Sequence, residues 1–122
     1  MKTPLEIVNK FLELTNDKKD IAGAVELMAD DITFTGPTLK TKSAQEYKAL
    51  LEQFLAFHAG WKKYAEFENG DQVVVIDGIF IKTPAGETIT LSLTEWFKIS
   101  NGKITEHKVY YDPREFLKAF GM

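Results

Sequence analysis

A carboxylic acid and a histidine in the last third of the chain are the residues best suited to chemistry. Residues 88–99 and 103–111 read as two strands joined at Asn101-Gly102, a pair that tolerates the positive φ of a tight turn. On the first strand Glu95 interrupts an alternating apolar series, which consists of Ile89, Leu91, Leu93, Phe97 and Ile99. With a one-residue bulge at the turn, we expect Ile99 opposite Lys103 and Glu95 opposite His107. The acid and the imidazole then meet on the buried face.

This pair has three possible interpretations: a solvated pair near a sheet end, a structural ion pair, or part of a functional site. A carboxylate within an apolar run costs several kcal/mol unless it is paired, neutralised or hydrated. In the catalytic interpretation His107 would accept or deliver a proton near neutral pH, and Glu95 would orient it or act as a neutral donor.

Composition limits the remaining classes of function. The 122 residues are 44% apolar, which fits a single domain over residues 1–122. A net charge of −3 without a basic run argues against nucleic acid and anionic membranes as partners. Zero cysteines exclude disulfides and cysteine nucleophiles, and two histidines far apart give no metal-ligand spacing. We therefore expect no metal, no cofactor, no membrane span and a soluble cytoplasmic protein.

The order of elements indicates helices first and a meander of strands second. Thr3 and Glu6 form a capping box for a helix over about residues 4–15, and Asp17 is expected to cap a second helix to about Ala29. Ser43 opens a third helix, whose apolar stripe ends with His58. Strands are predicted at residues 31–35, 61–67, 73–82, 88–99 and 103–111, followed by a helical turn or two over residues 113–121.

Short turns between the later strands make each neighbouring pair antiparallel. The predicted fold class is therefore α+β, with the helices on one face of a curved, mainly antiparallel sheet.

The run Phe97-Lys98-Ile99-Ser100-Asn101-Gly102-Lys103-Ile104 and the strand end Tyr110-Tyr111-Asp112 resemble the SnoaL-like group of the NTF2-like superfamily. The resemblance covers essentially the whole chain. It implies a cone, in which the sheet wraps round the long third helix and encloses an apolar pocket. Polyketide cyclases, ketosteroid isomerases and limonene-epoxide hydrolases belong to this group.

The catalytic residues of those enzymes are only partly matched. Glu95 falls where ketosteroid isomerases hold a protonated aspartate, but their aspartate base falls on Gly36 and no tyrosine lies in the first helix. The resemblance therefore implies no isomerisation of 3-ketosteroids. Limonene-epoxide hydrolases carry a tyrosine, an asparagine and an aspartate at the positions of Phe34, Gly36 and Val109, and the cyclase aspartate also falls on Val109.

The resemblance implies a pocket for a small, largely apolar molecule. The positions expected to line it are Phe34, Tyr47, Leu51, Phe54, His58, Leu91, Leu93, Phe97, Val109 and Tyr111. Three functions stay open: a binding protein with weak acid/base chemistry, an isomerase, cyclase or epoxide hydrolase that uses Glu95 and His107, and an interaction module that acts through the outer sheet face.

The family alignment also implies a homodimer through the convex face of the sheet. It points four apolar residues of the strand at 73–82 away from the cone, together with Trp96 and Tyr110; the four are Val73, Val75, Ile79 and Ile81. A shift of one residue at the Pro84 turn would reverse this face and bring Asp77 inside as a catalytic acid or base.

Overall fold

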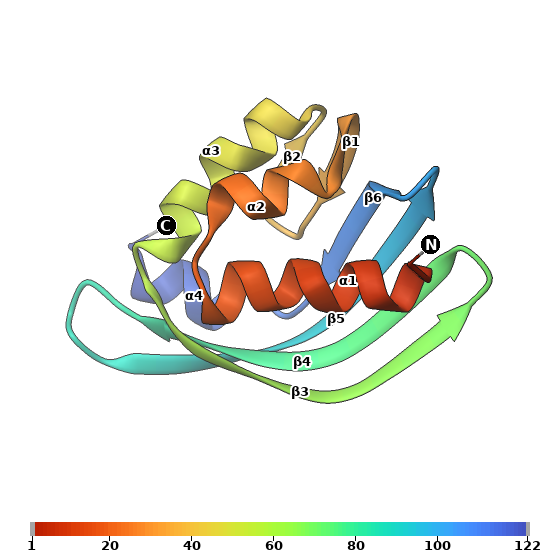
Figure 1. The fold of residues 1–122 in the computed structure, drawn as a ribbon. Coiled ribbons are helices and arrows are strands. Elements are labelled where there is room, and N and C mark those ends of the chain that lie inside the picture. Colours follow the sequence, from red (N-terminus) through yellow and green to blue (C-terminus); the bar gives the residue numbers. More distant parts are fainter. Residues whose placement is uncertain (1, 122) are drawn as a thin grey trace.

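The computed structural model describes residues 2–121. The chain begins with helix α1 (Pro4–Leu12), a π-helix η1 (Glu13–Asp17) and helix α2 (Ile21–Glu26), and its remaining elements follow in Figure 1. They are β1 (Met28–Thr35), β2 (Lys40–Thr41), α3 (Ala44–Leu55), β3 (His58–Asn69), β4 (Gln72–Lys82), β5 (Thr88–Ser100), β6 (Lys103–Tyr110) and α4 (Arg114–Ala119).

The strands form one six-stranded sheet in the order β2-β1-β6-β5-β4-β3. The pairing of β1 with β6 is parallel and every other pairing is antiparallel, so the predicted α+β class is confirmed. The sheet curves strongly, and the helices lie on its concave side (Figure 1). The helix in the hollow is α1, which contacts β3 to β6, whereas the third helix, α3, packs mainly against β1.

The helices begin at their capping side chains, and the apolar stripes in the sequence are a poorer guide to where each helix ends. The Thr3–Glu6 capping box forms as expected, and the Ser43 hydroxyl accepts from the backbone of Glu46. The second helix is shorter than predicted, because Asp20 rather than Asp17 caps it and because Ala29 already lies in β1.

The third helix also ends before His58, which is instead the first residue of β3.

The expected orientation of β4 is wrong. Val73, Val75, Ile79 and Ile81 lie on the concave face with exposed fractions of 6% or less, and Asp77 lies among them. The turn after β4 explains the reversal: Thr83 donates to the Glu87 carbonyl, so that Lys82 pairs with Thr88. This register places Ile81 beside Ile89 and Asp77 beside Leu93 on the inner face.

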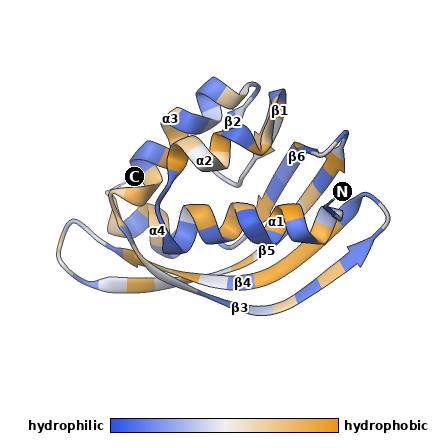
Figure 2. Cartoon of the chain, in the orientation of Figure 1, coloured by the Kyte–Doolittle hydropathy of each residue, from blue (hydrophilic) through white to orange (hydrophobic). Residues whose placement is uncertain are grey.

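Apolar side chains on α1 and the inner strand faces form the core. The orange bands of Figure 2 mark the hydrophobic residues along α1 and the strands. Beneath α1 the core is dense, and Val73, Val75, Phe97 and Ile104 are 0% exposed. A second cluster lines the hollow on the side of α4; we name it the apolar wall, and its members are Ile79, Ile81, Ile89, Leu91, Leu93 and Val109. Five of these six keep 6–9% of their surface exposed.

Within residues 2–121 no helix is both long and apolar enough to cross a membrane.

Candidate functional site

The β5–β6 hairpin carries the acid and the imidazole in a register that differs from the expected one. Asn101 and Gly102 have φ of 53° and 74° and form a two-residue turn, so Ser100 pairs with Lys103 and Ile99 with Ile104. Thr105 is then an extra residue, because Lys98 pairs with Glu106. This bulge turns His107 onto the inner face, where it lies opposite Phe97, while Glu95 lies opposite Val109.

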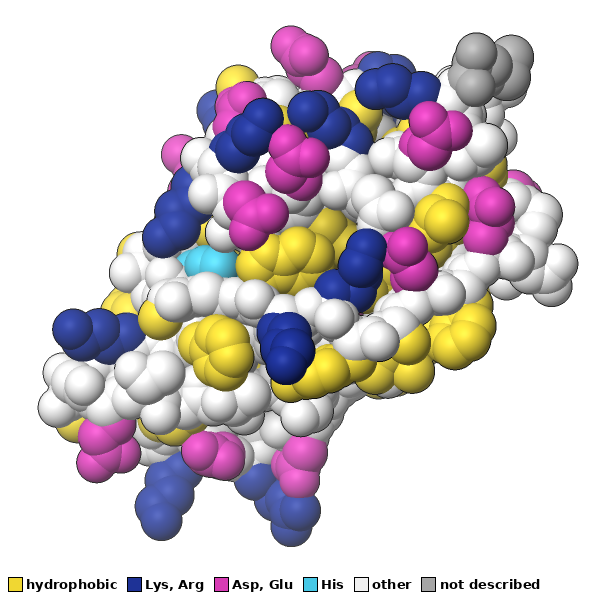
Figure 3. Space-filling model, turned by 60° about the horizontal axis from the view of Figure 1, so that its bottom comes forward, with side chains coloured by type: hydrophobic (Ala, Val, Ile, Leu, Met, Phe, Trp, Pro, Cys, Tyr) yellow, Lys and Arg dark blue, Asp and Glu magenta, His cyan; other side chains and the backbone are white. Residues whose placement is uncertain are grey.

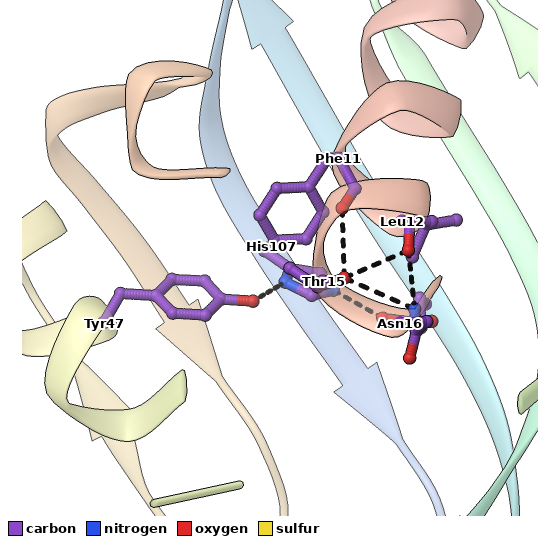
Figure 4. Close-up of polar contacts among 7 residues, drawn as sticks. Phe11, Leu12, Thr15, Asn16, Tyr47 and His107 are labelled. Carbon is purple, nitrogen blue, oxygen red and sulfur yellow. Dashed lines mark hydrogen bonds and ion pairs between the residues drawn. The ribbon is translucent and has the colours of Figure 1, made fainter. Parts of the chain in front are cut away.

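Glu95 and His107 are diagonal neighbours and are hydrogen bonded, as the sequence predicts. His107 Nε2 lies 2.8 Å from Glu95 Oε1, and His107 Nδ1 lies 2.5 Å from the hydroxyl of Tyr47. Figure 4 shows Tyr47 reaching from α3 toward His107 on β6. The chain of contacts therefore joins a helix to two strands across the interior of the cone.

Asp77 is the fourth member of this cluster. No N–H or hydroxyl donor of the described residues reaches either of its carboxyl oxygens, and it lies on the inner face of β4, diagonally across from Glu95 on β5. Two carboxyl groups this close in the interior are not both ionised. Burial, and next the hydrogen bond with Glu95, raise the pKa of Asp77 to about 10, so Asp77 is the protonated partner at neutral pH.

The direction of every hydrogen bond follows from these protonation states. Burial raises the pKa of Tyr47 well above its usual value, so its hydroxyl keeps its proton and donates to His107 Nδ1. His107 Nε2 must then carry the ring proton and donate to Glu95. Burial lowers the pKa of His107 to about 3, which keeps the imidazole neutral. His107 and Asp77 therefore both donate to a Glu95 carboxylate.

The environment of the cluster distinguishes Glu95 from its partners. Phe97 stacks on the His107 ring with centroids 4.1 Å apart, and Phe11 and Phe34 present their edges to it. The Glu95 side chain keeps 8% of its surface exposed, against 4% for the side chain of His107, and Asp77 as a residue keeps 1%. Burial raises the pKa of Glu95, while the Asp77 hydrogen bond lowers it. Glu95 is thus both the charged member of the cluster and the more accessible one in this comparison.

A second buried histidine lies at the other end of the apolar wall. His58 is 6% exposed, pairs with Ile81 across β3 and β4, and its ring meets Phe54 edge to face. Its Nε2 lies 2.9 Å from Asn16 Oδ1, whereas its buried Nδ1 has no partner among the described residues. Burial, and secondly the charge of Lys19, lower the pKa of His58.

The structure separates the residues predicted to line a pocket into two groups. Tyr47, Leu51 and Phe97 belong to the dense core beneath the helices. The others lie on or against the apolar wall, apart from His58 at its end; they are Phe34, Phe54, Leu91, Leu93, Val109 and Tyr111. Phe34 contacts both clusters.

The sequence contained no indication of Asn16, and it offered Asp77 only as an alternative. Asn16 follows the predicted apolar stripe of the first helix and gave no signal, because its importance depends on the π-helix that turns it toward His58. Asp77 was expected inside only under the alternative register, and the structure does place it on the inner face. Within residues 2–121 no group of three or more histidine, aspartate or glutamate side chains is arranged to hold a metal ion.

The fold and this enclosed acid–imidazole cluster define a cone-shaped α+β protein with a polar interior site. The chain belongs to the SnoaL-like family, because the SnoaL-like domain matches residues 8–107. No curated protein shows significant sequence similarity to it.

Solved structures with this fold include several NTF2-like proteins. An NTF2-like protein of unknown function from Cytophaga hutchinsonii is 24% identical, with a TM-score of 0.82 and 96% of each chain covered. A protein from Mesorhizobium loti that is provisionally named a SnoaL-like polyketide cyclase is 28% identical, with a TM-score of 0.74, 90% of this chain and 100% of that chain covered. TerC, co-crystallised with polyporic acid, is 21% identical, with a TM-score of 0.84 and coverages of 98% and 100%.

Proposed function

We propose that this protein binds a small, largely apolar molecule against the apolar wall and that Glu95 acts on it as a general base. The observation that carries the proposal is a pair of buried acids, Asp77 and Glu95, on the inner faces of neighbouring strands, with Glu95 hydrogen bonded to His107. Such a pair keeps a proton on one acid and a negative charge on the other inside the protein, at a cost of several kcal/mol. Packing alone gives no reason to retain it.

Glu95 is the member of the cluster best placed to exchange a proton with a ligand. Its pKa is raised toward neutral pH, and a carboxylate with a higher pKa is a stronger base than an ordinary glutamate. The donors His107 and Asp77 fix its orientation and hold its charge. The role expected for His107 therefore changes, because a neutral ring between two hydrogen-bonded groups orients the base rather than titrating near pH 7.

The reaction class that suits this geometry is proton removal from a carbon next to a carbonyl group. The C–H bond breaks, its proton moves to a Glu95 oxygen, and its electron pair is delocalised onto the carbonyl oxygen as an enolate. Return of the proton to the same or a conjugated carbon completes an exchange or an isomerisation and regenerates the carboxylate. The naming of related structures as polyketide cyclases and the TerC complex with polyporic acid support a small organic ligand.

Hydrogen exchange in heavy water tests this reaction directly. With 2-acetylnaphthalene as the probe, proton NMR should show loss of the acetyl methyl signal faster with the protein than with buffer alone. Glu95→Gln should reduce the added rate by at least about 100-fold, the usual contribution of a general base. The exposed Glu87→Gln is the matched control and should exchange like the wild type. Equal rates for wild type and Glu95→Gln would refute Glu95 as the base.

A carrier without turnover is the second candidate, favoured by the near-complete burial of Asp77 and His107. Saturable binding of 2-acetylnaphthalene without methyl exchange would establish it. In either case we place the protein in the cytoplasm, with which its lack of cysteine is compatible.

We further propose a homodimer through the convex face, although with residues other than those expected from the sequence. The corrected register of β4 turns Val74, Ile76 and Phe80 outward on this face. Tyr64, Phe67 and Tyr110 are 57–58% exposed, and Trp96 is half-buried. Figure 3, which brings the underside of the sheet forward, shows hydrophobic side chains bordered by charged ones. Such a patch with a polar rim is typical of an association surface.

A further inference from the structure

We propose that His58 Nδ1 is a second ligand-binding atom, which accepts a hydrogen bond from a hydroxyl group at the end of the ligand remote from Glu95. This inference rests on the proposed function, because it assigns the far end of the same ligand. The supporting observations are the bare acceptor on His58, its fixed tautomer and its distance from the acidic cluster.

The tautomer of His58 is set by the π-helix. Asn16 Nδ2 donates to the carbonyl of Leu12 at 3.1 Å and to Thr15 Oγ1 at 3.3 Å, contacts that Figure 4 shows. A carbonyl oxygen can only accept, so the amide nitrogen of Asn16 must face Leu12 and its oxygen must face His58. The oxygen in turn requires a proton on His58 Nε2. His58 Nδ1 is therefore a lone-pair acceptor and cannot donate.

This acceptor is enclosed yet unsatisfied. It lies within a residue that is 6% exposed, and no donor in residues 2–121 reaches it. Leaving a buried polar atom without a partner costs about 1–3 kcal/mol. Thr83 Oγ1 is likewise buried without a partner, two residues beyond Ile81, which pairs with His58. A ligand hydroxyl would recover this cost, whereas an ether or a carbonyl oxygen would meet the Nδ1 lone pair with its own.

The spacing defines the length of the ligand. Asp77, the neighbour of Glu95, and Ile81, the partner of His58, mark the two ends of the site on β4. They both lie on its inner face and are four residues apart, a separation of about 13 Å. The inner side chain between them is Ile79 of the apolar wall. The contact groups at the two ends take up part of this span. The class of ligand is accordingly an elongated, flat apolar molecule with a carbonyl at one end and a hydroxyl at the other.

The cover over this end of the wall is suited to admitting such a molecule. Phe116 of α4 and Phe120, which caps its C-terminal end, pack against the wall, and Phe120 meets Phe57 edge to face. No residue of α4 is buried, so moving these rings aside disrupts little of the core.

Three probes that differ at one position test the assignment: 2-acetylnaphthalene, its 6-hydroxy derivative and its 6-methoxy derivative. Calorimetric titration of the wild type should show the hydroxy compound binding about 5- to 100-fold tighter than the unsubstituted one, with the methoxy compound no tighter than the unsubstituted one. His58→Phe keeps an aromatic ring against Phe54 but has no ring nitrogen, so the Nδ1 acceptor is lost. That variant should bind the hydroxy and unsubstituted compounds within about twofold of each other.

A measurement on the wild type covers the case in which His58→Phe does not fold. In nitrogen-15 NMR spectra the Nδ1 signal of His58 should move with the hydroxy compound and stay in place with the unsubstituted one. His107, whose two ring nitrogens already have partners, serves as the internal reference.

The outcomes separate the two proposals. Binding of all three probes with equal affinity, or an unmoved His58 Nδ1 signal, would overturn the His58 assignment and leave the proposed function standing. Failure of all three probes to bind would refute both.

Discussion

At the scale of single residues, the unusual feature is a protonated Asp77 that donates to a charged Glu95 in the interior. The folded state raises the pKa of Asp77 from 3.8 to about 10, chiefly by burial. Folding therefore retains a proton that the unfolded chain releases above about pH 4. The contribution of Asp77 to the free energy of unfolding is complete below about pH 4 and is lost as the pH rises toward 10.

Asp77→Asn is expected to remove this dependence, because its amide can donate to Glu95 without having to hold a titratable proton. Between pH 7 and pH 9 the free energy of unfolding of the wild type should fall by up to about 1.4 kcal/mol per pH unit relative to that of the variant. His107, with its pKa lowered to about 3, is neutral in the folded state over this interval, and its titration in the unfolded chain is the same in both proteins. Chemical denaturation at pH 7, 8 and 9 measures the difference.

The exposed Asp31→Asn is the matched control and should follow the wild type at each pH. Parallel curves for wild type and Asp77→Asn would mean that Asp77 is ionised in the folded protein.

At the scale of elements, the sequence of the β5–β6 turn predicted where the chain reverses but not where the strand bulges. The Asn101-Gly102 dipeptide predicted the turn correctly, since both residues adopt positive φ. The sequence did not predict that the extra residue would be Thr105. Ile104 donates its N–H to the carbonyl of Leu27, at the edge of β1, so a strand distant in sequence fixes where the hairpin bulges. A hydrogen bond between residues so far apart in the sequence cannot be predicted from the residues around the turn.

The same limit applies to β4. Its alternation of apolar residues predicted a strand, but Val74, Ile76 and Phe80 make the outer face nearly as apolar as the inner one. The hydrogen bonds of the turn after Lys82 decide the orientation, and neither Pro84 nor Gly86 specifies them by residue type alone. The meander and the Glu95–His107 contact were therefore predictable, whereas the placement of Asp77 and Asn16 was not.

Substitution at Asn101 tests the turn itself. With φ of 53°, this position disfavours a Cβ without a polar side chain, and glycine carries no such penalty. Asn101→Ala should lower the free energy of unfolding by about 1 kcal/mol, whereas Asn101→Gly should stay within about 0.5 kcal/mol of the wild type. Urea denaturation of the three proteins compares them. Equal losses for alanine and glycine would show that the Asn101 side chain, and not its backbone angle, stabilises the turn.

At the scale of the whole molecule, the proposed dimer places its interface on the convex face. Ile76 lies near the centre of this face on β4, whereas Leu39 lies in the loop between β1 and β2, and each is 39% exposed. Ile76→Glu should convert the proposed dimer to a monomer, because the carboxylate would be buried in the interface. Leu39→Glu introduces the same charge at equal exposure and should leave the dimer intact. Light scattering at micromolar concentration distinguishes the two, and a monomeric wild type would refute the proposal.

The parallel pairing of β1 with β6 has a consequence for synthesis on the ribosome. Residues 28–35 can take their place in the sheet only after residues 103–110 have emerged, although about 70 residues separate the two strands. Until then the apolar faces of α1 and α3 have no complete sheet to cover. Residues 28–35 therefore stay without their β6 partner while β3, β4 and β5 are being made, and the cone can close only once β6 has left the ribosome.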